Sequence, residues 1–159
     1  MAEAWEEPVV TSLGPVRWQQ VKDPIGRRLC YLMVTDSGRP PYQLVGYMTV
    51  EDPATVDEGT RRPLDPIDRR VDTVWVHPAA RGHSIARALG SLAKGHGLFV
   101  SHSQTRTTAG TAWARALGDD LPPPEEQPDS HKFDVGAERY YRALLAANPG
   151  LGEPTHRLP

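Results

Sequence analysis

The segment VDTVWVHPAARGHSIARAL, residues 71–89, restricts the fold more than any other part of the chain. Its first six residues are mostly β-branched or aromatic, which is typical of a central strand over 71–76. Pro78 ends this strand, because proline has no N–H to donate to a neighbouring strand. After a short Arg-Gly turn, apolar residues recur at helical spacing and predict a helix over about 84–94. This order predicts the start of a strand–helix–strand unit.

Apolar runs on both sides of this segment predict a mixed sheet. Residues 29–35 and 43–50 are two β-rich runs joined by a link that contains glycine and proline, so we expect an antiparallel hairpin. The apolar run 98–101 follows the predicted helix, and we expect it to be the parallel neighbour of 71–76. The fold class is therefore α/β or α+β.

The remaining segments complete a single predicted domain. A chain of 159 residues has room for one domain, which we expect over 1–148 with its core at about 29–118. Two further helices are expected, over about 109–117 and 135–147. The other segments are predicted to be an irregular arm with at most one edge strand (1–20), a long loop (51–70) and a disordered tail (149–159).

Composition excludes several classes of protein. A net charge of −2 does not favour a nucleic-acid partner. No run approaches 18 apolar residues and the acidic start lacks the apolar region of a signal peptide, so we expect a cytoplasmic protein without a membrane span. The single cysteine, Cys30, excludes an intrachain disulfide and a cysteine-based zinc site, and the six histidines lack an HExxH spacing. No metal is expected.

The turn between the predicted strand and helix has the composition of an anion site. The first amides of a helix lack partners within it, and the helix dipole adds partial positive charge there. Gly82 lets the backbone approach a ligand, Arg81 can donate to a phosphate, and Ser84 can cap the helix. The alternative is structural, because any tight strand-to-helix turn selects a glycine and a capping serine. Neither GxxxxGK[ST] nor GxGxxG is present.

The stretch VHPAARGHSIARAL, residues 76–89, resembles the acyl-CoA-binding motif of the GNAT superfamily of N-acetyltransferases. In that motif a strand ending in V-x-P leads to [QR]-x-x-G-x-[GA] and a helix rich in Ala and Leu. Arg81 matches its first position and Ala86 its last, whereas Ser84 stands where the family usually has glycine. The resemblance covers roughly residues 29–118 and is specific around 74–89.

The resemblance implies a coenzyme, acetyl-CoA, and a place for it. Its thioester would lie where the strands 71–76 and 98–101 splay apart, with a backbone N–H near Trp75 or Val76 polarising the carbonyl. The implied coenzyme-binding residues are Trp75, Val76, Arg81, Gly82, His83, Ser84, Ile85, Ala86 and Arg106.

Three side chains are candidates for the general base of that reaction. Asp72 lies on the first strand, His102 at the end of the second and His77 at the strand end before Pro78. Each has a structural alternative; for Asp72 it is pairing with Arg69 or Arg70. The family's tyrosine acid would fall at Ala114 and is absent, and Tyr140 and Tyr141 have the spacing of core residues.

These features predict an acyl-CoA-dependent N-acetyltransferase that moves an acetyl group from acetyl-CoA to an amine of an unknown acceptor. The alternative is a non-catalytic acyl-CoA-binding or protein-interaction module on a GNAT-like scaffold. The family usually ends its sheet with two further strands, whereas this chain offers an acidic, proline-rich loop and a helix. The acceptor half of the site would then be open or completed by a partner chain, as in a homodimer.

Overall fold

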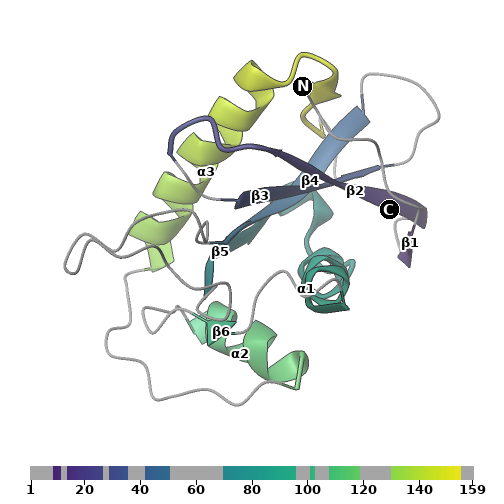
Figure 1. Ribbon diagram of the computed structural model, residues 1–159, viewed down its shortest axis with the longest axis vertical. Helices are drawn as coiled ribbons and strands as arrows, with labels where there is room; N and C mark the ends of the chain where they lie inside the picture. The colour runs from purple at the N-terminus through teal and green to yellow at the C-terminus, as the bar shows by residue number, and fades with distance from the viewer. Residues whose placement is uncertain are drawn as a thin grey trace.

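A computed structural model describes residues 9–11, 14–26, 29–35, 42–50, 70–95, 101–102, 108–118 and 130–154. These residues form an α+β fold in which helices cover both faces of one mixed sheet (Figure 1). The strands are β1 (Val9–Thr11), β2 (Gly14–Lys22), β3 (Leu29–Thr35), β4 (Tyr42–Val50), β5 (Arg70–Val76), β6 (Ser101–His102) and β7 (Leu151–Gly152). The helices are α1 (Ile85–Gly95), α2 (Thr108–Ala116) and α3 (Ser130–Ala147).

The sheet runs in the order β1-β2-β3-β4-β5-β6, and β7 pairs with β4. Pairing is antiparallel from β1 to β5, and β5–β6 and β4–β7 are parallel. The predicted hairpin is therefore confirmed, and so is a parallel neighbour of β5 after α1. That neighbour is described only at Ser101–His102, and residues 98–100 of the predicted strand lie outside the described residues. β3 and β4 are buried along most of their length because both faces of the sheet are covered.

Two hydrophobic cores lie on opposite faces of this sheet. The first packs under α1 and α2 and includes Tyr31, Met33, Met48, Ile85 and Leu89. The second packs under α3 and includes Leu32, Leu44, Tyr47, Trp75, Tyr140, Tyr141 and Leu144. The core positions predicted for Tyr140 and Tyr141 are thus confirmed, although the helix begins at Ser130 rather than near residue 135.

The sequence prediction was wrong at both ends of the domain. Residues 14–22 are not an irregular arm but a nine-residue strand paired along its length with β3. Val16 and Trp18 alternate with polar Arg17 and Gln19, a two-residue period that the polar residues hide. At the other end, residues 149–154 are part of the fold, because β7 pairs with the start of β4 and Tyr42 N donates to Gly150 O at 3.1 Å.

Some predicted segments lie outside the described residues. They include most of the 51–70 loop, residues 96–100 before β6, and residues 155–159. No helix in the described part of the chain is long and apolar enough to cross a membrane.

A glycine sets how closely α2 approaches α1. A Cβ added at Gly90 of α1 would lie 2.7 Å from Trp113 Cζ2 and 2.8 Å from Leu117 Cδ1. Trp113 Nε1 donates to Ala86 O at 2.7 Å, which fixes the indole against the first turn of α1. α2 therefore braces the start of α1 through a contact that requires Gly90.

We expect Gly90→Ala to lower the free energy of unfolding by about 1–3 kcal/mol, because the added methyl overpacks this contact. The matched control is Gly95→Ala at the end of α1, where an added Cβ meets no heavy atom within 4 Å. That variant should keep or gain up to about 1 kcal/mol through helix propensity. Urea unfolding curves measure both values, and equal stability of the two variants would contradict the contact.

Candidate functional site

The end of β5 is an open edge in the described structure. β6 pairs with β5 only through Arg70↔Ser101 and Val71↔His102, whereas β5 continues to Val76. On its other side β5 pairs with β4 as far as Val76. The strands thus pair at the start of β5 and leave its second half without a described partner on the β6 side.

Backbone directions along β5 follow from one hydrogen bond. His77 N donates to Val45 O at 2.9 Å, so Val76 and Gly46 form a non-hydrogen-bonded pair. The alternation of an antiparallel ladder then points the N–H of Trp75 toward β4, and the N–H groups of Val74 and Val76 toward the open edge. The sequence prediction named Trp75 or Val76 as the residue whose N–H faces the open edge. The ladder gives this direction to the N–H of Val76 and also to that of Val74, but not to that of Trp75.

The first half of the turn after β5 is closed by its own residues. Ala79 N donates to His77 Nδ1 at 3.0 Å, Ala80 N to His77 O at 2.8 Å and Arg81 N to Pro78 O at 3.4 Å. These bonds form a short 3-10 turn over Pro78–Ala80. This part of the link has no amide to offer a ligand.

The second half of the turn has a different arrangement. The backbone N–H groups of Gly82, Ser84, Ile85, Ala86 and Arg87 have no hydrogen-bond partner among the described residues. They lie just before and within the first turn of α1, where the helix dipole is positive. Gly82 (φ +87°) and Ser84 (φ +60°) both adopt left-handed backbone conformations, and a Cβ at Gly82 would meet nothing within 4 Å. These five open amides form an arc that begins at Gly82 and ends at Arg87.

Ser84 adopts a backbone conformation that favours glycine. A left-handed φ costs an L-residue roughly 1–2 kcal/mol. The capping bond predicted for the Ser84 hydroxyl is absent from the contacts described for this turn, so that side chain offsets none of the cost.

We expect Ser84→Gly to raise the free energy of unfolding by up to about 1 kcal/mol. Glycine relieves the backbone strain of the left-handed φ, and the greater conformational entropy of glycine in the unfolded chain offsets part of that gain. Gly82→Ala, the reverse change at the neighbouring left-handed position, should lower it. Thermal unfolding of both variants measures the difference. A decrease for Ser84→Gly would contradict the assigned backbone conformation.

Arg81 is held against the end of β5 rather than directed into the arc. Its Nε donates to Val76 O at 3.1 Å, and its Cζ lies 5.8 Å from the centroid of the Trp75 ring. Its Nη2 is 3.7 Å from Asp134 Oδ1 on α3, with both side chains half exposed. If Arg81 contributes to anion binding as predicted, it can do so only through the guanidinium N–H groups that these contacts do not use.

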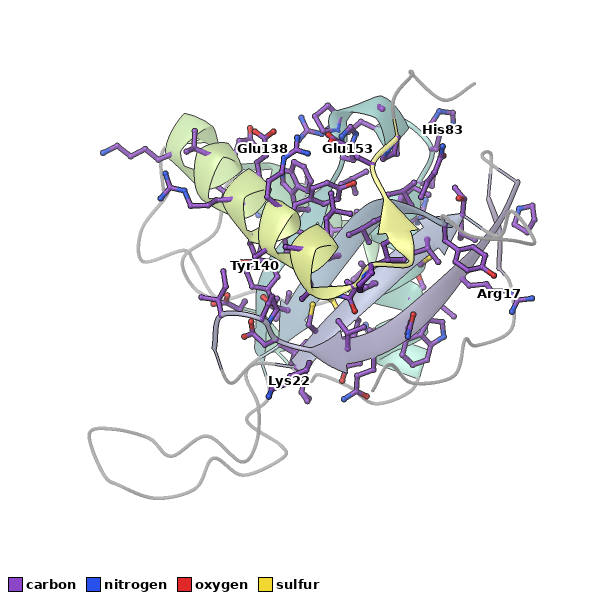
Figure 2. All side chains as sticks on the ribbon, turned by 90° about the horizontal axis from the view of Figure 1, so that it is seen from above. Arg17, Lys22, His83, Glu138, Tyr140 and Glu153 are labelled. Carbon is purple, nitrogen blue, oxygen red and sulfur yellow. The ribbon has the colours of Figure 1, made fainter. Side chains whose placement is uncertain are left out.

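The other predicted coenzyme residues have mixed placements. Ile85 is buried in the α1-side core and Ala86 O accepts from Trp113, so both would reach a ligand through their N–H groups. His83 lies in the turn, partly buried (Figure 2). Arg106 lies outside the described residues.

His77 is engaged at both ring nitrogens. Because Nδ1 accepts from Ala79 N–H, it carries no proton, and Nε2 donates to Glu153 Oε1 at 2.8 Å. To act as a base, His77 would have to give up the bond that shapes the 3-10 turn. The geometry therefore favours its structural alternative.

Glu153 connects the C-terminal segment to this turn. Besides His77, its carboxylate binds the guanidinium of Arg142 on α3 through both oxygens. These contacts, with Arg142 first and His77 second, lower the pKa of Glu153 from 4.5 to about 2. The contacts hold β7 and the residues after it against the end of β5.

Because the folded pKa of Glu153 lies below its unfolded value, its contribution to stability is complete above about pH 4.5 and is lost as the pH falls toward 2. We expect Glu153→Gln to flatten the loss of stability over that range. Glu138→Gln is the control, because it removes a carboxylate from the exposed side of α3, opposite Tyr140 (Figure 2). Urea midpoints measured from pH 2 to 6 report the slopes, and identical slopes for wild type and Glu153→Gln would contradict the assignment.

A β-bulge redirects Asp72. Thr49 pairs with Thr73 and Val50 with Val71, so Asp72 is the extra residue of β5. As a result Val71 faces α1 whereas Thr73 and Asp72 meet on the α3 side. Thr49 Oγ1 and Thr73 Oγ1 donate to Asp72 Oδ2 at 3.3 and 3.2 Å. His102 pairs with Val71 through its backbone, so it lies near Asp72 and far from His77 along β5.

A pocket of about 260 Å³ is lined by Thr49 and Thr73, the two threonines that donate to this carboxylate. It lies between the α3-side face of the sheet and the first half of α3, and it is lined by Tyr47, Thr49, Thr73, Lys132, Phe133, Gly136, Ala137 and Tyr140. Sequence reasoning missed it, because neither the bulge nor the early start of α3 leaves a periodic signal. Of the three predicted bases, Asp72 and the backbone of His102 thus lie near the start of β5, and His77 lies at its other end.

Neither candidate tyrosine replaces the missing acid. Tyr140 Oη donates to Asp23 Oδ1 at 2.9 Å and Tyr141 Oη to Leu44 O at 2.7 Å. Burial raises the pKa of both phenols, and Ala114 is fully buried. Burial also raises the pKa of the Cys30 thiol to about 12, which removes it as a nucleophile.

In the described part of the chain, no three His, Cys, Asp or Glu side chains gather as metal ligands. Comparison of the chain with protein-family models, with curated proteins and with solved structures finds no match. The function is therefore argued from the site.

Proposed function

We propose that this chain is an acyl-CoA-dependent N-acetyltransferase of the GNAT type that transfers an acetyl group from acetyl-CoA to an amine. The observation that carries the proposal is a pair of features on either side of the closed 3-10 turn. They are the five open amides of the arc from Gly82 to Arg87 and the edge at Val74 and Val76, which has no described partner. A ligand with an anionic diphosphate and an extended, amide-containing arm is complementary to both. Acyl-CoA is such a ligand.

Acetyl-CoA supplies a thioester whose carbonyl carbon accepts an amine nitrogen and whose thiolate leaves. In the proposed complex the open amides of the arc bind the diphosphate, as helix N-termini commonly do. The N–H groups of Val74 and Val76 bind carbonyl oxygens along β5, including the one on which charge develops. Asp72, beside the bulge, accepts the proton lost by the amine, directly or through water.

Binding of the diphosphate can be tested by charge reversal in the first turn of α1. We expect Arg87→Glu to weaken acetyl-CoA binding about tenfold or more, because a carboxylate beside the arc repels the diphosphate. The same carboxylate favours the helix dipole, so the variant should stay folded. Arg115→Glu, an exposed arginine on α2, carries the same change in net charge and should bind as wild type does.

Isothermal titration calorimetry with acetyl-CoA measures the three affinities. Equal weakening in Arg87→Glu and Arg115→Glu would reduce the effect to net charge. Unchanged binding in Arg87→Glu would contradict the assignment of the arc.

The second candidate function is a non-catalytic acyl-CoA-binding module. It is favoured by His77, Tyr140 and Tyr141, whose proton-transfer atoms are all engaged within the fold. Release of free thiol from acetyl-CoA in the presence of pooled primary amines separates the two candidates. Turnover that falls sharply in Asp72→Asn supports the enzyme, whereas tight binding without turnover across the pool supports the module.

A further inference from the structure

His77 closes the turn after β5 with one ring nitrogen and joins it to the C-terminal segment with the other. Nδ1 accepts from Ala79 N–H at 3.0 Å, and Nε2 lies 2.8 Å from Glu153 Oε1. The bond to Ala79 caps the 3-10 turn over Pro78–Ala80. Because an ionised carboxylate only accepts, the proton of the neutral ring is on Nε2. The ring therefore has one nitrogen left as an acceptor, and Ala79 N–H uses it.

A proton added to this ring can bind only at Nδ1, because Nε2 already carries one. The imidazolium then has two donors and no acceptor, so Ala79 N–H loses its partner and meets the new hydrogen on Nδ1. Nε2–H keeps its acceptor. The pKa of Glu153 is lowered to about 2, so its carboxylate stays ionised wherever histidine side chains titrate. The ring therefore stays on Glu153, and the backbone of the turn is the part that moves.

The surroundings of His77 hold the ring in place but leave it in contact with water. The centroids of the Trp75 and Tyr141 rings lie 6.1 and 5.4 Å from that of the imidazole. The His77 side chain is 12% exposed, so protons can exchange with solvent. The charged and titratable groups described around the ring are Glu153 of the C-terminal segment, Arg142 and Tyr141 of α3, and the Arg81–Asp134 pair between the turn and α3.

We propose that His77 and Ala79 form a proton-operated switch in the turn after β5. With the ring neutral, Ala79 N–H is paired and the first half of the turn is closed. Uptake of one proton from water at Nδ1 breaks that bond while the ring stays on Glu153, and the first half of the turn opens. His77 acts here as a positioning residue for the backbone, not as a base toward substrate.

The switch lies directly before the open amides of the arc. Ala79 is three residues before Gly82, where the arc begins. Protonation adds one positive charge and one open N–H to this part of the chain, and both favour a bound anion. Above the transition the turn stays closed and Ala79 takes no part in binding. Affinity for an anion at the arc therefore rises as the pH falls. This consequence rests on the proposed acyl-CoA site, whereas the switch itself does not.

Backbone amide NMR of the labelled full chain without ligand tests the switch. Between about pH 5 and 8, where histidine side chains titrate, the Ala79 amide signal should move with the same midpoint as the His77 ring signals. His77→Asn keeps an acceptor for Ala79 N–H, since asparagine is a favoured cap, but it cannot take up a proton there. Ala79 should show no transition in that variant. A constant Ala79 signal in wild type, or the same change in His77→Asn, would overturn the switch.

Two carboxylate variants test the part played by Glu153. Glu153→Gln keeps an acceptor for Nε2–H but removes the negative charge that favours the imidazolium, so the Ala79 transition should move to lower pH. Glu138→Gln removes another carboxylate that contacts Arg142 and should keep the wild-type midpoint. An unchanged midpoint in Glu153→Gln, or equal changes in the two variants, would contradict the anchoring of the ring by Glu153.

Acetyl-CoA affinities at about pH 6 and about pH 8 separate this inference from the proposed function. From the higher to the lower pH, wild type should gain about threefold more affinity than His77→Asn, the effect of one added charge nearby in water. Equal gains, with the Ala79 transition present, would overturn the link to the arc. If acetyl-CoA binds at neither pH and the Ala79 transition is present, the acetyltransferase proposal fails and the switch stands.

Discussion

The rest of the site depends on which backbone N–H and C=O groups of β5 are hydrogen-bonded to neighbouring strands. One side of the strand is paired with β4 as far as Val76, and the bond from His77 N to Val45 O fixes which groups face that side. On the other side the pairing described with β6 stops at Val71. Val74 and Val76 therefore direct polar groups to an edge that no described strand covers, next to a turn whose later amides are also open. These unpaired groups of the described residues are the ones that the proposed acyl-CoA ligand would engage.

Much of the surrounding structure serves to hold this junction in place. Gly46 allows β4 to approach Trp75 O and Ile85 Cγ2, to 3.0 and 3.2 Å from its ideal Cβ position, and so seats α1 directly against the sheet. α2 braces the first turn of α1 through Trp113 and Ala86. From the other face, Glu153 and Arg142 fix His77, and Arg81 bridges the strand end and α3. Elements distant in sequence thus converge on about ten residues after Trp75.

Sequence reasoning identified the junction because its signals are local. Pro78, Gly82 and the apolar repeat of α1 each act within a few residues, and the left-handed φ of Ser84 falls where the GNAT motif has glycine. The features that sequence reasoning did not predict depend on partners that are distant in the chain. β2 is specified by pairing with β3, β7 by pairing with β4, and the bulge at Asp72 by register against β4. The engagement of His77 Nε2 also depends on the position of Glu153, which is distant in the chain.

The central claim is that the open amides of the arc and the edge of β5 contact one acyl-CoA ligand. Backbone amide NMR of the labelled chain during titration with acetyl-CoA tests it most directly. The account predicts that the largest shifts occur at Gly82, Ser84, Ile85, Ala86 and Arg87 together with Val74 and Val76, while Ala79 and Ala80 change little. No shift at millimolar acetyl-CoA, or shifts confined to another surface, would contradict it.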